Sequence, residues 1–139
     1  MKAVATLGPE GFRTEIKVDP DLGHSLLSDE PQDRGGTNAG PTAFGLLASA
    51  LAACTVATIR SYANLKGLKL TRVVAEVDAS RRTPSEQNEA GPDAKMAVVH
   101  KKITIEGDIS DEQRRRILQI AEKCPVNRTL LEGADINHA

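Results

Sequence analysis

The chain has 139 residues, a formal net charge of −1 and 2% aromatic residues. This length predicts one domain, 1–139, with a core of Ala, Val, Leu and Ile. The balanced charge and scarce aromatics disfavour binding to nucleic acid or to an anionic membrane. The N-terminal residues lack the apolar segment of a secretory signal, and the most apolar run, Phe44–Ala57, is too short to span a bilayer. We therefore expect a cytoplasmic protein with neither a nucleic acid nor a membrane as a partner.

The first third of the chain predicts an antiparallel meander of three short strands. Their expected ranges are Ala3–Leu7, Phe12–Val18 and His24–Ser28, and the second strand alternates between apolar and charged residues. A segment rich in Gly, Pro and Asp follows at Asp29–Pro41. This pattern predicts a long loop, and long ordered loops often carry function.

A long helix is predicted from Thr42 to about Lys66, with Gly67 in place to end it. Between Leu46 and Ala57 almost every residue is apolar or small, which is typical of a helix buried on nearly all sides. Because a chain this short can cover such a helix only in part, we expect a second subunit to cover the rest.

The second half predicts a β-hairpin followed by two helices. Alternation at Leu70–Ala79 indicates the first strand, and the second presents Val99, Lys101, Ile103 and Ile105 on one face. The polar segment 81–95 between them is expected to be a flexible loop. Ser110 and Gln113 form a capping box that opens a helix, and Pro125 opens a short one at Val126–Leu131.

The only two cysteines, Cys54 and Cys124, are the candidate catalytic residues. In a reducing compartment they are either small buried apolar residues or a reactive pair. Cys124 is expected to N-cap the helix that Pro125 opens, where amide groups and the helix dipole favour a thiolate. Cys54 lies in mid-helix and needs a cation from elsewhere. The candidates are Arg34 in the loop, Arg60 on the same helix and Arg128 after Cys124.

Neither a metal site nor a cofactor is expected. His24, His100 and His138 are isolated in the sequence, without the spacing of metal ligands. The glycines at 35, 36 and 40 do not match a phosphate-binding loop.

Two stretches, DEPQDRGGTNAGPTAFGLLASALAACTVATIRSYANLKGLKL and ITIEGDISDEQRRRILQIAEKCPVNRTL, resemble the OsmC/Ohr superfamily, in particular its OsmC-like branch. The resemblance implies the α+β class and an intertwined homodimer in which antiparallel sheets wrap around central helices that bear the cysteines. It also implies that Cys54 is the peroxidatic and Cys124 the resolving cysteine of an enzyme that reduces organic hydroperoxides in oxidative or osmotic stress. A dithiol, such as a lipoyl group, would then regenerate the pair.

The sequence departs from the peroxidase pattern at one position. Peroxidase members carry a glutamate nine or ten residues before the first cysteine, where this chain has Gly45 and Phe44. Arg34 remains the candidate for the activating arginine, with Glu30 or Asp33 as a replacement carboxylate. A glycine inside a helix also suggests close approach of another group. The alternatives are a non-catalytic module that binds a small apolar or acyl ligand, and a hydrolase or thiol-transfer role for Cys54.

Overall fold

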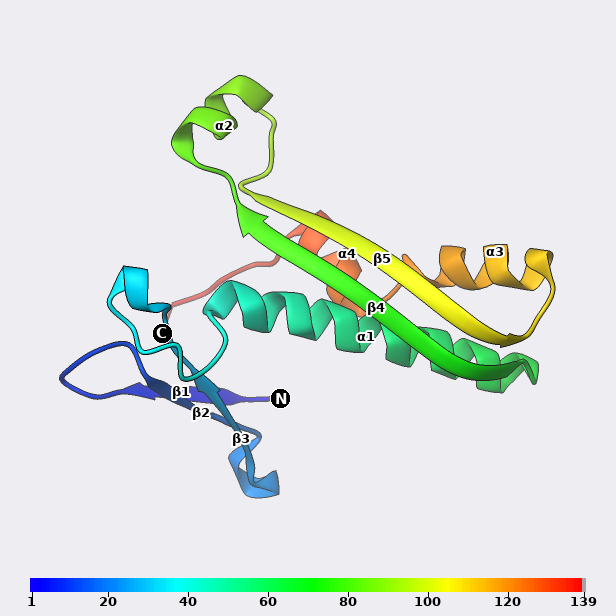
Figure 1. Cartoon of the computed structure of the whole chain (residues 1–139), viewed down its shortest axis with the longest axis horizontal. Coiled ribbons are helices and arrows are strands. Elements are labelled where there is room, and N and C mark those ends of the chain that lie inside the picture. Colours follow the sequence, from blue (N-terminus) through cyan, green and yellow to red (C-terminus); the bar gives the residue numbers. More distant parts are fainter. Residues whose placement is uncertain (139) are drawn as a thin grey trace. The chain divides into compact units, whose positions relative to one another are not determined.

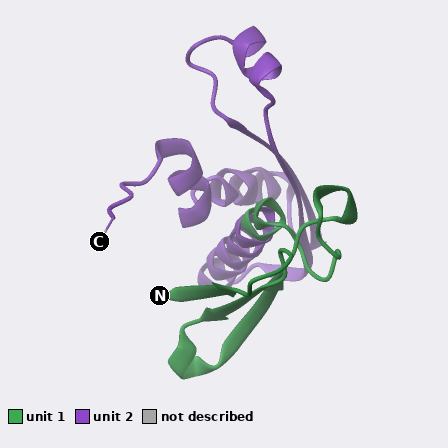
Figure 2. Ribbon diagram, turned by 90° about the vertical axis from the view of Figure 1, so that its left-hand side faces the viewer, with its two compact units in different colours: residues 1–47 green, residues 48–139 purple. Residues whose placement is uncertain are grey.

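The computed structural model describes residues 1–138 and contains two compact units, Met1–Leu47 and Ala48–Ala139 (Figure 2). Each unit has its own antiparallel sheet, and this combination of antiparallel sheets with helices confirms the predicted α+β class. The single domain that the length suggests stays a prediction.

The first unit contains the predicted meander. Strands β1 (Ala3–Leu7), β2 (Thr14–Val18) and β3 (His24–Ser28) pair in the order β1-β2-β3 (Figure 1). The sheet register places Ile16 opposite Ala5 on one side and Leu26 on the other. The strands therefore agree with the sequence pattern, except that β2 begins two residues later than the pattern suggested.

The predicted loop at 29–41 is ordered around the carboxylate of Asp29, whose residue is only 2% exposed. This carboxylate accepts hydrogen bonds from Thr37 Oγ1 at 2.6 Å, Glu30 N at 2.8 Å, Thr37 N at 3.0 Å and Ala39 N at 3.1 Å. The Thr37 hydroxyl and then the Ala39 amide are the main causes that lower the pKa of Asp29 to about 2. Gly36 packs so closely on the Glu30 carbonyl that a Cβ would overlap it. One buried carboxylate thus holds a loop that has only the short 3₁₀ turn η2 (Gln32–Arg34) inside it.

Helix α1 (Ala43–Lys66) confirms the long helix expected from the sequence. Thr42 Oγ1 accepts from Gly45 N at 3.1 Å at its start, and Gly67 follows its end with a left-handed φ of 64°. Its buried residues recur every fourth position, at Leu51, Thr55, Ile59 and Ala63, which places them on one face.

The other faces of α1 are not fully covered within the one chain. An exposed row on it contains Ala50, Ala53 and Ala57, so the expected burial on nearly all sides is not reached by this chain alone. The sequence argument that its apolar run is too short to span a bilayer does not extend to the whole helix. By length and composition α1 could cross a membrane, although the core helix of a soluble protein meets the same criteria.

The second unit contains the hairpin of β4 (Lys69–Arg81) and β5 (Ala97–Asp108). The prediction of a flexible loop at 81–95 was wrong, because helix α2 (Pro84–Ala90) lies at the hairpin tip (Figure 1). Its capping box joins Thr83 and Glu86: Glu86 N donates to Thr83 Oγ1 at 3.3 Å, and Thr83 N donates to Glu86 Oε2 at 2.7 Å. These residues are a helix-start signal that the polar composition of the segment concealed.

The core of the second unit joins α1, the hairpin and α3 (Asp111–Ala121). Its members are aliphatic and nearly or completely buried: Ile59, Ala63, Leu70, Ile105, Ile117 and Ala121. Helix α3 starts at the predicted capping box, where Gln113 N donates to Ser110 Oγ at 3.1 Å. Helix α4 (Pro125–Glu132) follows directly. This core holds the end of α3 against α1, and so determines where the second cysteine lies.

Candidate active site

Cys54 and Cys124 lie together in the second unit, although seventy positions separate them in the chain. Cys54 lies in mid-α1 and is half-buried, whereas Cys124 is fully buried between α3 and α4. Both thiols are free, and they lie close enough that each shifts the pKa of the other. The fold therefore places the two candidate sulfurs within reach of one another.

Cys124 is the N-cap of α4, as its position before Pro125 predicted. Its sulfur accepts a hydrogen bond from Asn127 N at 3.3 Å and a longer one from Thr55 Oγ1 at 3.9 Å. The amide groups at a helix N-terminus and the positive end of the helix dipole stabilise a negative charge on this sulfur. Cys124 thus has several donors that favour its thiolate.

The two thiols differ in acidity because their pKa values are shifted in opposite directions. Burial raises the pKa of Cys54, and the Val126 amide only partly offsets this, because the neighbouring Cys124 side chain and its charge raise the pKa further. Burial also opposes ionisation of Cys124. The Asn127 amide, the Cys54 thiol and the Thr55 hydroxyl outweigh it, so the pKa of Cys124 is lowered. In the resting pair Cys124 is therefore the acceptor and Cys54 the proton donor.

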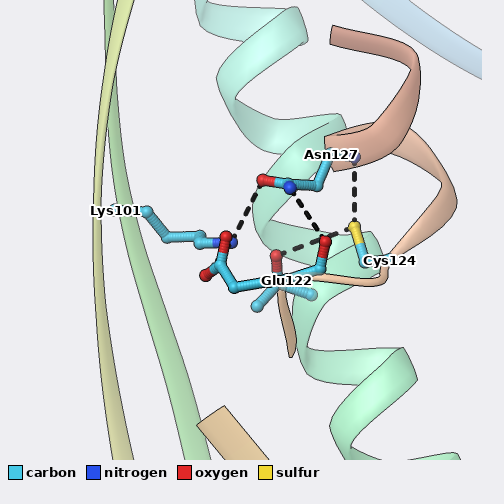
Figure 3. A network of polar contacts seen from close by, with 5 residues as sticks. Lys101, Glu122, Cys124 and Asn127 are labelled. Carbon is cyan, nitrogen blue, oxygen red and sulfur yellow. Dashed lines mark hydrogen bonds and ion pairs between the residues drawn. The ribbon is translucent and has the colours of Figure 1, made fainter. Parts of the chain in front are cut away.

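A largely covered lysine contacts Asn127, the residue whose amide donates to this sulfur. The Lys101 side chain, only 10% exposed, forms an ion pair with Glu122 Oε1 at 3.0 Å and donates to Asn127 Oδ1 at 3.2 Å (Figure 3). Asn127 Nδ2 donates in turn to the Glu122 carbonyl at 2.9 Å. Asn127 therefore connects the cation on β5 to Cys124.

Sequence reasoning did not assign a role to Lys101, Asn127 or Thr55. A usable signal existed for Lys101, because a lysine shares the inward strand face of Val99, Ile103 and Ile105. Asn127 stands three residues after an N-cap, the position whose amide an N-cap side chain contacts. For Thr55 no comparable signal exists, since a threonine next to Cys54 is unremarkable in a helix.

The three candidate arginines have other partners. Arg60 Nη1 donates to the Leu70 carbonyl at 3.2 Å, and Arg128 pairs with Glu132 at 2.8 Å on the exposed side of α4. Arg34 lies in η2 of the first unit and forms an exposed ion pair with Glu30 Oε2 at 3.8 Å. Its role as the group that activates Cys54 stays a prediction, as do the catalytic roles of both cysteines.

Gly45 does mark a close approach, as its place in the helix suggested. A Cβ at this position would lie 3.2 Å from Pro41 Cβ and 3.6 Å from Thr42 Oγ1. The group that approaches Gly45 is thus the pair Pro41 and Thr42, which leads into α1. The first turn of α1 carries no acidic residue, so the usual carboxylate has no substitute in that turn.

A cleft of about 450 Å³ opens beside the lysine network. Its walls are mainly apolar side chains of α1, β5 and α4, with four polar residues among them: Leu51, Ala97, Val99, Leu130 and Leu131 with Lys95, Lys101, Glu122 and Asn127. Across residues 1–138 no three His, Cys, Asp or Glu side chains gather in a group that could hold a metal ion.

Comparison with known proteins agrees with this geometry. The family model described as OsmC-like protein matches residues 36–139. No curated protein matches the sequence.

Three solved structures resemble the chain in fold. An OsmC-like protein from Mycoplasma pneumoniae has a TM-score of 0.75 at 20% identity, and the match covers 95% of this chain and 87% of that protein's chain. An organic hydroperoxide resistance protein from Legionella pneumophila has a TM-score of 0.66 at 23% identity, covering 98% and 92%. One from Elizabethkingia anophelis, with thiocyanate bound, has a TM-score of 0.62 at 19% identity, covering 91% and 85%. At these identities the likeness is one of fold.

Proposed function

Because this chain belongs to the OsmC family, we propose that it is a thiol-dependent peroxidase that reduces organic hydroperoxides through Cys54 and Cys124. The observation that carries the proposal is the pair of free thiols, one half-buried and one buried, which lie close enough that each shifts the pKa of the other. Two of the structural relatives are named organic hydroperoxide resistance proteins, which supports the same substrate class.

The difference in acidity gives each sulfur a role. Cys54 is the more exposed of the two, so it meets the peroxide. As its sulfur attacks the distal peroxide oxygen, its proton passes to the Cys124 thiolate. The O–O bond breaks, Cys54 becomes a sulfenic acid, and the leaving alkoxide takes that proton from Cys124 to leave as the alcohol.

The second step closes the pair. The Cys124 thiolate attacks the Cys54 sulfur, an S–S bond forms, and the hydroxide that leaves takes a solvent proton to become water. In total, two thiols and one hydroperoxide give one disulfide, one alcohol and water. A dithiol reductant, such as a lipoyl group, then restores both thiols by exchange. Arg34 is our candidate for a cation that further activates Cys54.

Turnover of the hydroperoxide tests this function directly. Purified protein is given cumene hydroperoxide and a dithiol, and dithiol oxidation is followed for wild type, Cys54→Ser and Cys124→Ser. We expect both variants to lose turnover, and Cys124→Ser to accumulate a sulfenic acid that dimedone traps. Equal rates for wild type and Cys54→Ser would exclude the peroxidase.

We also propose that the protein works as an intertwined homodimer in the cytoplasm, in which α1 is a core helix. The uncovered face of α1, with Ala50, Ala53 and Ala57, supports this, because small residues let a second helix approach closely. Sedimentation equilibrium should show a dimer for wild type and for Ala134→Glu, which adds the same charge to an exposed loop. Ala57→Glu should shift the population toward monomer, and an unchanged dimer would argue against this interface.

The cleft favours a second candidate function, namely binding of a small apolar or acyl ligand without turnover. Its apolar walls and its volume of about 450 Å³ suit such a ligand. Native mass spectrometry of freshly purified protein would detect a bound molecule. A ligand that is retained by both wild type and Cys54→Ser, with no peroxide turnover in either, would favour this function over the peroxidase.

A further inference from the structure

We propose that Lys101 is a positioning residue. Through its contacts with Glu122 and the Asn127 side chain, it holds the Asn127 backbone N–H on the Cys124 sulfur, and so keeps the negative charge of the thiol pair on Cys124. The inference concerns the same thiols as the proposed peroxidase. It deepens that function by naming the group that decides which thiol is ionised.

The geometry is a chain of short contacts (Figure 3). Lys101 Nζ lies 3.2 Å from Asn127 Oδ1, and Asn127 Nδ2 donates to the Glu122 carbonyl at 2.9 Å. Both ends of the Asn127 amide group are therefore held, from β5 on one side and from the end of α3 on the other. The backbone N–H of the same residue lies 3.3 Å from Cys124 Sγ, so the residue that Lys101 and Glu122 hold by its side chain is also the residue whose amide donates to the sulfur.

The fold itself does not need a lysine here. The neighbours of Lys101 on the inward face of β5 are Val99, Ile103 and Ile105, and an aliphatic residue would continue that face. Burial of an ammonium group is unfavourable unless it is paired and hydrogen-bonded. Glu122 and Asn127 meet these conditions, and both lie in the segment that carries Cys124, which ties the cation to the thiol site.

The charge of Lys101 alone does not explain the effect. The titratable or charged groups around Cys124 come from four segments: Cys54 on α1, Lys101 on β5, Glu122 and Lys123 before α4, and Arg128 on α4. Arg128 is paired with Glu132, and the carboxylate of Glu122 lies 3.0 Å from Lys101 and offsets its field at the sulfur. Lys101 therefore acts mainly through the Asn127 amide that it orients, and less through its own charge.

The test measures thiol ionisation and needs no peroxide. Cys54→Ser keeps a hydroxyl donor in place of the Cys54 thiol and leaves one titrating thiol, whose thiolate absorbs in the ultraviolet. In this background we expect Lys101→Met to lower the thiolate fraction of Cys124, at a pH below its titration midpoint, by about three- to tenfold. Lys101→Arg, which keeps a buried cation with several donors, should restore most of the loss.

Two further variants separate this role from its alternatives. Lys102→Met removes an identical charge from the neighbouring exposed lysine, which pairs with Glu76 at 3.0 Å, and it should leave the titration unchanged. Asn127→Ala keeps the Lys101–Glu122 pair but cuts the link, and it should reproduce the Lys101→Met shift, with no further shift in the double variant.

The outcomes distinguish the inference from the proposed function. An unchanged Cys124 titration in Asn127→Ala would overturn the inference even if Lys101→Met fails to fold. Equal shifts in Lys101→Met and Lys102→Met would overturn it in favour of a long-range charge effect. Failure of peroxide turnover in wild type would reject the peroxidase and leave these titrations unaffected.

Discussion

The opposite pKa shifts of the two neighbouring thiols predict that removal of either cysteine changes the pKa of the other in opposite directions. Cys54 acts as a donor that lowers the pKa of Cys124, so Cys54→Ala should raise the pKa of Cys124. Cys124 in turn raises the pKa of Cys54 through its neighbouring side chain and its charge, so Cys124→Ala should lower the pKa of Cys54. Two independent thiols would show neither effect.

The size of the first effect follows from the contacts of Cys124. A hydrogen bond to a charged group is worth about 1.5–3 kcal/mol, and a thiol is a weak donor, so we take the lower end. At about 1.4 kcal/mol for each factor of ten, loss of this donor should reduce the thiolate fraction of Cys124 about tenfold. The Asn127 amide at 3.3 Å and the Thr55 hydroxyl at 3.9 Å remain in place, so Cys124 should stay more acidic than Cys54.

The assay is ultraviolet thiolate absorbance against pH for three single-thiol proteins. Cys54→Ser is the matched control for Cys54→Ala, because a hydroxyl still donates to the Cys124 sulfur. We expect Cys54→Ser to titrate at lower pH than Cys54→Ala. If the two superimpose, or if Cys124→Ala raises the titration of Cys54, the thiols do not share a proton and the assignment of donor and acceptor is refuted.

Three other substitutions test the surroundings of the site. Thr55→Val removes a long hydrogen bond to the buried sulfur and should lower the thiolate fraction of Cys124 about two- to threefold in the Cys54→Ser background. Asp29→Asn should destabilise the protein at neutral pH. The folded pKa of Asp29, about 2, lies below its unfolded value of roughly 3.9. The free energy of unfolding of wild type should therefore exceed that of Asp29→Asn by the full amount above pH ~4, and this difference should shrink as the pH falls toward about 2. Urea unfolding at each pH measures it. Gly45→Ala should stabilise α1 by up to about 1 kcal/mol, reduced by the methyl contact at 3.2 Å from Pro41, and a raised urea midpoint would show it.

The first two substitutions each have a neighbouring control. Thr58→Val removes a hydroxyl that hydrogen-bonds Cys54 instead, so in a Cys54→Ser protein the titration of Cys124 should not move. Glu30→Gln removes a half-buried carboxylate with one long ion pair, and the stability of this variant should fall with decreasing pH in the same way as that of wild type. A lower urea midpoint for Gly45→Ala would mean that Pro41 cannot shift to admit the methyl group.

Local patterns were sufficient for most of the secondary structure. Period-two alternation located β2 and β5, and the capping pair of Ser110 and Gln113 located the start of α3. The one clear failure was α2, where polar residues at 84–90 suggested a loop. A helix at a hairpin tip needs no apolar face, so only its capping box, Thr83 with Glu86, could have identified it.

The sequence by itself determined that Cys54 lies in mid-helix and that Cys124, before Pro125, caps a helix, because both follow from neighbouring residues. It did not determine which cation or donor reaches each sulfur. Lys101 and Thr55 come from a strand and a helix that are distant from Cys124 in the chain. Thr55 reaches the sulfur and Lys101 reaches Asn127 beside it, because the core of Ile59, Ile105 and Ile117 packs these elements together. Only tertiary packing brings such groups within hydrogen-bonding distance, and that distance decides which thiol holds the charge.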